Sequence, residues 1–76
     1  RGGEGAEAFV ANPRQRLLME QLRAGDQIRP GEYHQRFAAD VTDRQARRDL
    51  VELADAGFLL RIGRGSGTIY RRTDRT

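Results

Sequence analysis

Residues 42–57 read TDRQARRDLVELADAG, and this stretch decides the fold because it predicts a helix with both ends marked. Thr42 and Gln45 have the spacing of a capping box, in which the Thr42 hydroxyl accepts from the Gln45 amide and the Gln45 side chain reaches back. Behind them, apolar residues recur at helical spacing until Gly57: Ala46, Leu50, Leu53 and Ala54. We therefore expect a helix over residues 43–56 with one apolar face.

The segment after this helix predicts a β-hairpin. Residues 58–62, FLLRI, have the composition of a strand, and three apolar side chains are expected to share one face: Phe58, Leu60 and Ile62. Residues 63–67, GRGSG, cannot form regular structure and are expected to make the hairpin tip. Residues 68–72, TIYRR, then return as the second strand.

A first helix is predicted near the amino end. Asn12 can cap it, and Pro13 fits its first turn. Its apolar stripe consists of Leu17, Leu18 and Leu22. Gly25 is expected to stop it, so the predicted helix spans residues 13–24.

A short strand and a second helix are predicted next. Residues 27–29 are expected to form the strand around a buried Ile28. Pro30 can open the helix, in which Tyr33 and Phe37 stand four residues apart on a shared core face. We expect this helix to end one or two residues after Phe37, where a turn of sequence ADV begins.

The order of these elements places the chain in the α+β class, mainly α. We expect one domain over residues 9–72, with a flexible lead-in at 1–8 and a flexible tail at 73–76. A chain of this length buries only about 60% of the surface it exposes when unfolded. No cysteine is present to form a disulfide, so apolar packing must supply the stability.

Basic charge is concentrated at the carboxyl end. Residues 1–57 carry nine arginines and ten acidic residues, whereas residues 58–76 carry five arginines and one aspartate, Asp74. Every one of the 14 basic residues is arginine. A local excess of cations favours a polyanionic partner such as nucleic acid or an anionic membrane surface.

The residue types present argue against a membrane protein, a metalloprotein and an enzyme. Apolar runs are far shorter than the roughly 20 residues that span a bilayer, and no signal peptide is recognisable, so a cytoplasmic protein is expected. There is no cysteine, and the single histidine, His34, and single serine, Ser66, fall in different elements. We therefore predict no cofactor, no metal site and no catalytic group, and the absence of lysine excludes a P-loop in GRGSG.

The order and spacing of the motifs resemble those of known DNA-binding domains. Three helices followed by a hairpin make the winged helix-turn-helix arrangement. Residues 41–70, VTDRQARRDLVELADAGFLLRIGRGSGTIY, resemble the Arg-Arg-Asp-Leu helix and glycine-rich wing of DeoR-type regulators. They are also similar to the carboxy-terminal winged helices of Fic proteins and of RecG-like transcriptional regulators, and residues 31–37, GEYHQRF, resemble the second helix of the same group.

This resemblance covers residues 13–72 and implies a function. It implies sequence-directed binding of double-stranded DNA in bacteria, either to regulate transcription or to target a larger protein to DNA. Whether the domain acts alone, beside other domains of a longer parent chain or as a homodimer is left open. Two departures matter: residues 38–40, AAD, make a longer turn than in DeoR proteins, which favours the other two groups, and Gln45 stands where these families commonly have threonine.

The amino-terminal turns of the helix at 43–56 are the expected reading surface, because a recognition helix enters the major groove amino end first. At about 100° per residue, Arg44, Gln45 and Arg48 point away from the core and Arg47 lies at its margin. Arginine can bind guanine at two atoms and glutamine can do so with adenine. We expect Arg44 and Gln45 to read bases, Arg47 and Arg48 to contact phosphates, and Asp49 to pair with an arginine and orient it.

The hairpin tip at 63–67 is the second expected contact. Arg64 stands between glycines and can approach the DNA backbone or a narrow minor groove, Ser66 can donate to a phosphate, and Arg71 and Arg72 enlarge the basic field. The full predicted DNA-binding set is Thr42, Asp43, Arg44, Gln45, Arg47, Arg48, Arg64, Gly65, Ser66 and Arg71.

Other interpretations of the same residues remain open. The RQARR face can be an ordinary solvated helix surface with ion pairs such as Arg48 with Glu52. The hydroxyl of Tyr70 can lie in the core or near a DNA backbone. The domain can also serve as a protein–protein interaction or regulatory module without DNA binding, although Val51 is the only apolar residue expected to be exposed near the reading surface.

Overall fold

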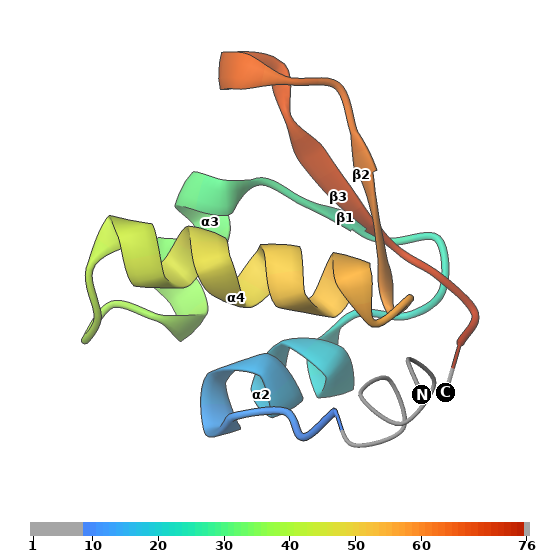
Figure 1. Ribbon diagram of the computed structural model, residues 1–76, viewed down its shortest axis with the longest axis horizontal. Coiled ribbons are helices and arrows are strands. Elements are labelled where there is room, and N and C mark those ends of the chain that lie inside the picture. Colours follow the sequence, from blue (N-terminus) through green and yellow to red (C-terminus); the bar gives the residue numbers. More distant parts are fainter. Residues whose placement is uncertain (1–8, 76) are drawn as a thin grey trace, which may run out of the picture.

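The computed structural model describes residues 9–75 of the 76-residue chain, so the predicted lead-in at 1–8 lies outside the described residues. The described part is a small α+β domain with three helices and a three-stranded antiparallel sheet, which confirms the predicted class and element order (Figure 1). Its elements are α2 (Pro13–Gln21), β1 (Gln27–Ile28), α3 (Pro30–Phe37), α4 (Asp43–Asp55), β2 (Leu59–Ile62), the short 3-10 turn η1 (Gly65–Gly67) and β3 (Ile69–Arg72).

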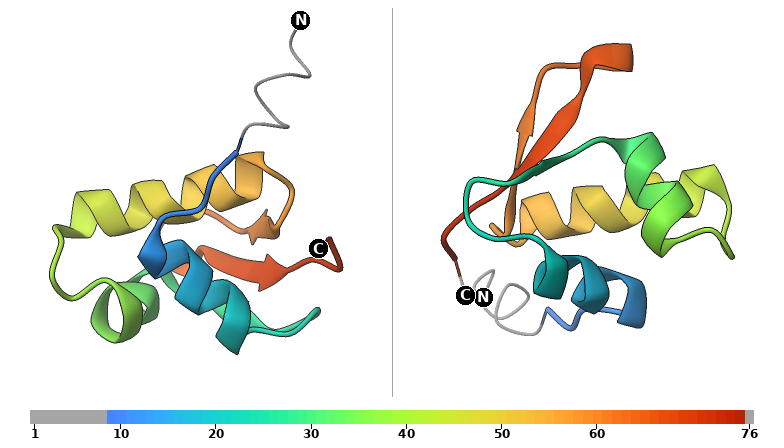
Figure 2. Two further views of the ribbon diagram at one scale, coloured as in Figure 1. Left: turned by 90° about the horizontal axis from the view of Figure 1, so that it is seen from below. Right: turned by 180° about the vertical axis from the view of Figure 1, so that it is seen from behind.

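Strand β3 is the centre of the sheet, whose order is β1-β3-β2. Ile28 of β1 pairs with Tyr70 of β3, and Tyr70 pairs with Arg61 of β2. Side chains that pair directly across antiparallel strands lie on the same face, so these three residues share the face that meets the helices. The hairpin of β2 and β3 projects beyond the helices in Figure 1 and in the right view of Figure 2.

Helix α4 forms close to the predicted bounds. The Thr42 hydroxyl accepts from the backbone amide of Gln45 at 3.1 Å, which satisfies one of the free amides of the first turn. The helix ends at Asp55, one residue before the predicted Ala56, and Gly57 adopts φ +91° just beyond it. Only glycine enters that region at no steric cost, so the predicted glycine stop is confirmed.

Helix α2 begins as predicted and ends early. Asn12 accepts from the Gln15 amide at 2.8 Å, and the Gln15 side chain accepts from the Asn12 amide at 2.9 Å, so a full capping box stands here. The predicted end at Ala24 is wrong, because Leu22 is already extended. The Asp26 carboxylate then accepts a hydrogen bond from the Arg23 backbone amide at 3.0 Å, and the chain turns here towards β1.

A hydrogen bond from the His34 side chain stabilises the turn between α3 and α4. Helix α3 ends at Phe37, and the Val41 amide donates to the Ala38 carbonyl at 3.2 Å. The Nε2 atom of His34 lies 2.8 Å from the Val41 carbonyl oxygen. Because a carbonyl only accepts, Nε2 carries the proton and donates. The long AAD turn is thereby held to the helix that precedes it.

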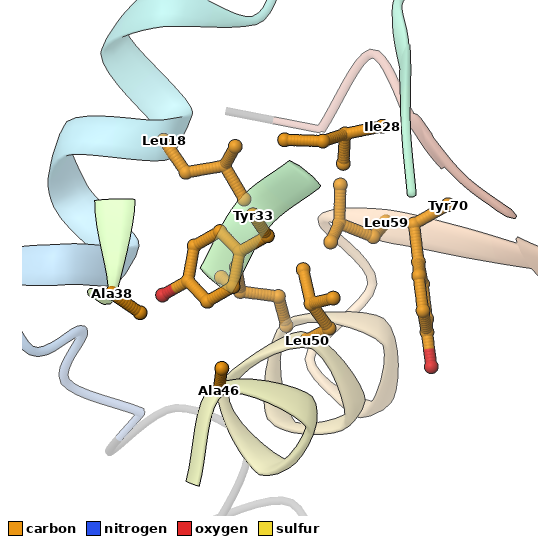
Figure 3. Close-up of a cluster of buried hydrophobic side chains, with 9 residues drawn as sticks. Leu18, Ile28, Tyr33, Ala38, Ala46, Leu50, Leu59 and Tyr70 are labelled. Carbon is orange, nitrogen blue, oxygen red and sulfur yellow. The ribbon is translucent and has the colours of Figure 1, made fainter. Parts of the chain in front are cut away.

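The core lies between the three helices and the inner face of the sheet, and each layer supplies buried apolar side chains (Figure 3). These are Leu18, Ile28, Tyr33, Ala38, Ala46, Leu50, Leu53, Leu59 and Tyr70. The predicted apolar face of α4 is confirmed. In α2 the prediction holds for Leu18 but not for Leu17, which is half-exposed, whereas Gln15 is buried.

Leu60 and Ile62 share one face of β2, as predicted, but the core meets the other face of the strand. Leu59 is 3% exposed and Leu60 is 46% exposed, so Leu60 shares the outer face with Ile62 rather than the core. The Phe58 amide donates to the Leu53 carbonyl at 2.9 Å, which fixes the exit of the chain from α4. Leu59 is then the first strand side chain directed at the helices.

The predicted flexible tail at 73–76 makes contacts as far as Arg75, and Thr76 lies outside the described residues. The Thr73 amide donates to the Phe58 carbonyl at 3.0 Å, and its hydroxyl donates to the Gly57 carbonyl at 2.6 Å. The Arg75 guanidinium lies 5.1 Å from the centre of the Phe58 ring. Residues 73–75 therefore pack on the turn after α4.

The sheet register predicts losses of stability of very different size for alanine substitutions at two neighbouring leucines. Leu59→Ala should lower the free energy of unfolding by about 2–5 kcal/mol, because it removes buried methyl groups and leaves a cavity. Leu60→Ala should change it by about 0.5 kcal/mol or less, as expected for an exposed position. Urea denaturation measures both, and a larger loss in Leu60→Ala would contradict this register.

Candidate nucleic-acid interface

The carboxylate of Asp49 is buried and accepts hydrogen bonds from all three helical segments. Its Oδ2 atom accepts from Nε of Arg14 and from the hydroxyl of Tyr33, both at 2.8 Å. Its Oδ1 atom accepts from the side-chain amides of Asn12 at 3.0 Å and Gln45 at 3.1 Å. It also accepts from a second nitrogen of the Arg14 guanidinium, at 3.2 Å. Asp49 therefore joins the start of α2, the middle of α3 and the first turns of α4.

These contacts keep Asp49 ionised. Burial by itself raises the pKa of this carboxyl, but the hydrogen bonds from Arg14, Tyr33, Gln45 and Asn12 lower it by more, so the pKa lies below its ordinary value of 3.8. Burial and the bond to Asp49 raise the pKa of the Tyr33 hydroxyl, which stays protonated and donates. A buried charge with this many donors is stable only as a complete network.

The prediction that Asp49 pairs with an arginine is thus confirmed. Its partner is Arg14 of α2, 35 positions away in the chain. The predicted capping box of α4 is also incomplete: the Gln45 side chain donates to Asp49 and does not accept from the backbone amide of Thr42. Gln45 is therefore partly buried and anchored, not a freely extended side chain.

The arginines of α4 are exposed, and two of them form ion pairs on their own helix. Arg47 lies 3.0 Å from Asp43, and Arg48 lies 3.5 Å from Glu52, the pair expected for a solvated face. Exposed pairs of this kind contribute about 0–1 kcal/mol, so a phosphate can replace either carboxylate at little cost. No described carboxylate pairs with Arg44, which is exposed on the first turn.

A groove of about 770 Å³ lies between α4 and the hairpin. Arg47 and Val51 line it from α4, and Arg61 and Ser66 line it from the hairpin. The amino-terminal turn of α3 closes it with Arg29 and Glu32, and Tyr70 contributes to its floor. Three arginines against one glutamate give this groove a positive field.

Arg61 and Arg71 lie on opposite faces of the sheet. Arg61 pairs with Tyr70, on the face that meets the helices, whereas Arg71 pairs with Gln27 and Leu60 on the outer face. The predicted contact Arg71 is therefore separated from α4 by the sheet, and Arg61, which was not predicted, takes its place beside Arg47 in the groove.

The hairpin tip contains a turn of regular structure, although none was expected in its glycine-rich sequence. One turn of 3-10 helix covers Gly65–Gly67, with Arg64 exposed just before it. Gly63 adopts φ +79°, and a Cβ atom there would lie 2.9 Å from the Gly67 carbonyl oxygen, so glycine is required. Gly65 and Ser66 line the groove, and the exposed Arg64 directly precedes them in the chain.

Arg72 has a structural role. One of its terminal nitrogens donates to the carbonyls of Thr73 at 3.2 Å and Arg75 at 2.9 Å. Its Nε atom is buried without a partner among the described residues. Arg72 therefore holds the carboxy-terminal segment.

Comparison of the chain with protein-family models, curated proteins and solved structures found no match. The function must therefore be inferred from the residues themselves. Within residues 9–75 no cluster of histidine, cysteine and acidic side chains could hold a metal ion. None of the described helices is long and apolar enough to cross a membrane.

Two groups of residues in this region were not predicted. Asn12 and Arg14 lie 37 and 35 positions from Asp49, and no local pattern marks such a partnership. Side chains two residues apart on a strand lie on the same face. The position of Arg61 in the groove could therefore have been predicted only by assigning Leu59, rather than Leu60, to the core. One signal in the sequence could have indicated a partner for Asp49: an aspartate on the apolar face of a helix is stable only when a buried cation or hydrogen-bond donor pairs with it.

The Asp49 network predicts different effects for two buried tyrosines. Tyr33→Phe should lower the free energy of unfolding by about 1.5–3 kcal/mol, because the hydroxyl bonds a charged acceptor. Tyr70→Phe should cost clearly less, because no hydrogen bond of the Tyr70 hydroxyl to a described residue exists and the ring is similarly buried. Chemical denaturation of both variants measures the contrast, and equal losses would contradict it.

The loss of unfolding free energy caused by Tyr33→Phe should also depend on pH. A carboxyl whose folded pKa is lowered stabilises the fold fully above its unfolded pKa, near 3.8 here, and loses that contribution as the pH falls through the folded value. The Tyr33→Phe penalty should therefore be constant at neutral pH and shrink below about pH 3.8. A penalty that grows in acid would show that Asp49 is not the acceptor that matters.

Proposed function

We propose that the chain is a winged helix-turn-helix domain that binds double-stranded DNA. The amino-terminal turns of α4 enter the major groove, and the hairpin tip lies on the backbone or the minor groove. The observation that carries this proposal is the arginine-lined groove between α4 and the hairpin, which Arg47 lines from the helix and Arg61 lines from the hairpin.

The size and charge of the groove suit a phosphodiester backbone. Phosphate contacts supply most of the affinity of proteins for DNA and fix their register on it. Arg47 and Arg61 can each contact a phosphate, and Ser66 can donate to one. Glu32, the acidic residue of the groove, is already paired with Arg36 at 2.8 Å, which weakens its repulsion of an anion.

Arg44 is the best-placed base reader of the predicted set. It is exposed on the first turn of α4, and no described carboxylate pairs with it. A free guanidinium can bind guanine O6 and N7 together. Thr42 and Asp43 stand at the same helix end, where free amides and the helix dipole favour a phosphate. The biological role that follows is regulation of transcription or attachment of a larger protein to DNA.

A second candidate function is a protein–protein interaction module. Val51 is 43% exposed and lines the groove, and Leu60 is 46% exposed on the outer face of the sheet. Apolar groups on both surfaces could meet another protein. The DNA proposal is favoured because Val51 is surrounded by arginines, which a protein-binding groove would have to desolvate.

Two neighbouring arginines provide the main test of the DNA proposal. Arg61→Ala should weaken binding to every duplex and reduce the slope of log affinity against log salt by about 1, as one phosphate contact is lost. Arg71→Ala removes the same charge from the outer face and should change both quantities less. Fluorescence anisotropy at several salt concentrations measures both, and equal effects would place the DNA outside the groove.

The reading role of Arg44 has its own test. Arg44→Ala should reduce affinity for the preferred duplex by about 1–3 kcal/mol and relax the preference at one base pair. Binding to random duplex should fall less. Equal losses on preferred and random DNA would make Arg44 a phosphate contact, and a lack of binding to any duplex at low salt would overturn the proposed function.

A further inference from the structure

The amide of Gln45 has a fixed orientation, because its partner can only accept. An ionised carboxylate has no proton to donate, and the five hydrogen bonds to Asp49 come from donors on Asn12, Arg14, Tyr33 and Gln45. The nitrogen of the Gln45 amide, and not its oxygen, must therefore face Asp49. The 3.1 Å contact is an Nε2–H donor on a carboxylate oxygen.

This contact leaves the other half of the Gln45 amide available. No described residue donates to Oε1 of Gln45, and one of the two N–H groups of Nε2 is also unused. The residue stands on the first turn of α4 beside the exposed Arg44. A base edge that approaches this turn therefore meets an acceptor with one N–H next to it.

We propose that Asp49 is a positioning residue that gives Gln45 a preference for adenine, and after it cytosine, in the major groove. Adenine presents an amino group and the N7 acceptor there, and cytosine presents an amino group alone. The Gln45 oxygen accepts from either amino group, and of these two bases only adenine offers an acceptor, N7, to the remaining N–H. This inference rests on the proposed DNA binding.

Guanine and thymine are disfavoured for the same reason. Both present acceptors to the centre of the major groove, and the Gln45 oxygen would face such an acceptor without a proton between them unless the amide turned its nitrogen outward. The oxygen of Gln45 would then lie against the ionised carboxylate of Asp49, with two acceptors in contact and no proton between them. Arg14 and Tyr33 hold that carboxylate from other helices, so it cannot turn away.

The orientation can be tested on the free protein. In one NMR spectrum of the isotope-labelled chain, the side-chain amide protons of Gln45 should exchange with water at least about tenfold more slowly than those of Gln35. Gln35 is an exposed glutamine on α3 with no side-chain hydrogen bond to a described residue, so it is the internal control. Equal exchange rates would overturn the anchoring of Gln45, whatever the protein binds.

The base preference is tested by selecting preferred duplexes from a randomised pool. Wild-type protein should enrich adenine, and less strongly cytosine, at one position by about tenfold. In Gln45→Met, which keeps the length of the side chain without its amide, enrichment at that position alone should disappear. In Asp49→Asn the new amide can donate, so Gln45 can turn its nitrogen outward, and guanine or thymine should replace adenine.

The outcomes separate the two proposals. Enrichment of guanine or thymine at the Gln45-dependent position of the wild type, or no such position, would overturn the base preference. If Asp49→Asn does not fold, the Gln45→Met selection and the exchange rates still decide. If no duplex binds at low salt, the DNA-binding proposal falls and the base preference with it, while slow Gln45 exchange would still establish that Asp49 holds the amide.

Discussion

The buried carboxylate of Asp49 sets how the three helices sit relative to one another. Its charge is acceptable inside the domain only while Arg14, Tyr33 and two amides all donate to it. Apolar packing alone tolerates small shifts of one helix along another, but five directed hydrogen bonds do not. The placement of α4 in front of the hairpin therefore depends on contacts with α2, even though α2 itself does not line the groove.

One face of the sheet serves two purposes along its length. Near the helices it carries Ile28, Leu59 and Tyr70, which complete the core. Two residues beyond Leu59 on the same face, the edge strand carries Arg61, opposite Tyr70, into the groove. The alternation that buries a leucine thus also fixes where the cation stands. A one-residue slip of β2 would expose the leucine and move the arginine to the outer face together.

Elements with local chemical signals were predictable from the sequence, and relations between distant elements were not. Thr42 and Gly57 mark the ends of α4, and the prediction missed its end by one residue. Which face of β2 meets the core could not be predicted, because Leu59 and Leu60 are equally apolar and only the exit of the chain from α4 distinguishes them. The partners of Asp49 and the separation of Arg61 from Arg71 depend on tertiary structure and sheet register.

Both ends of the described chain are held by one aromatic ring. Phe9 and Phe58 have ring centres 5.9 Å apart, and Arg75 lies over Phe58 from the other terminus. None of these three residues lines the groove. A dye, a surface tether or a fused domain joined beyond Phe9 or Arg75 would therefore be anchored beside Phe58, at the carboxyl end of α4. Such attachments leave the arginine-lined surface accessible.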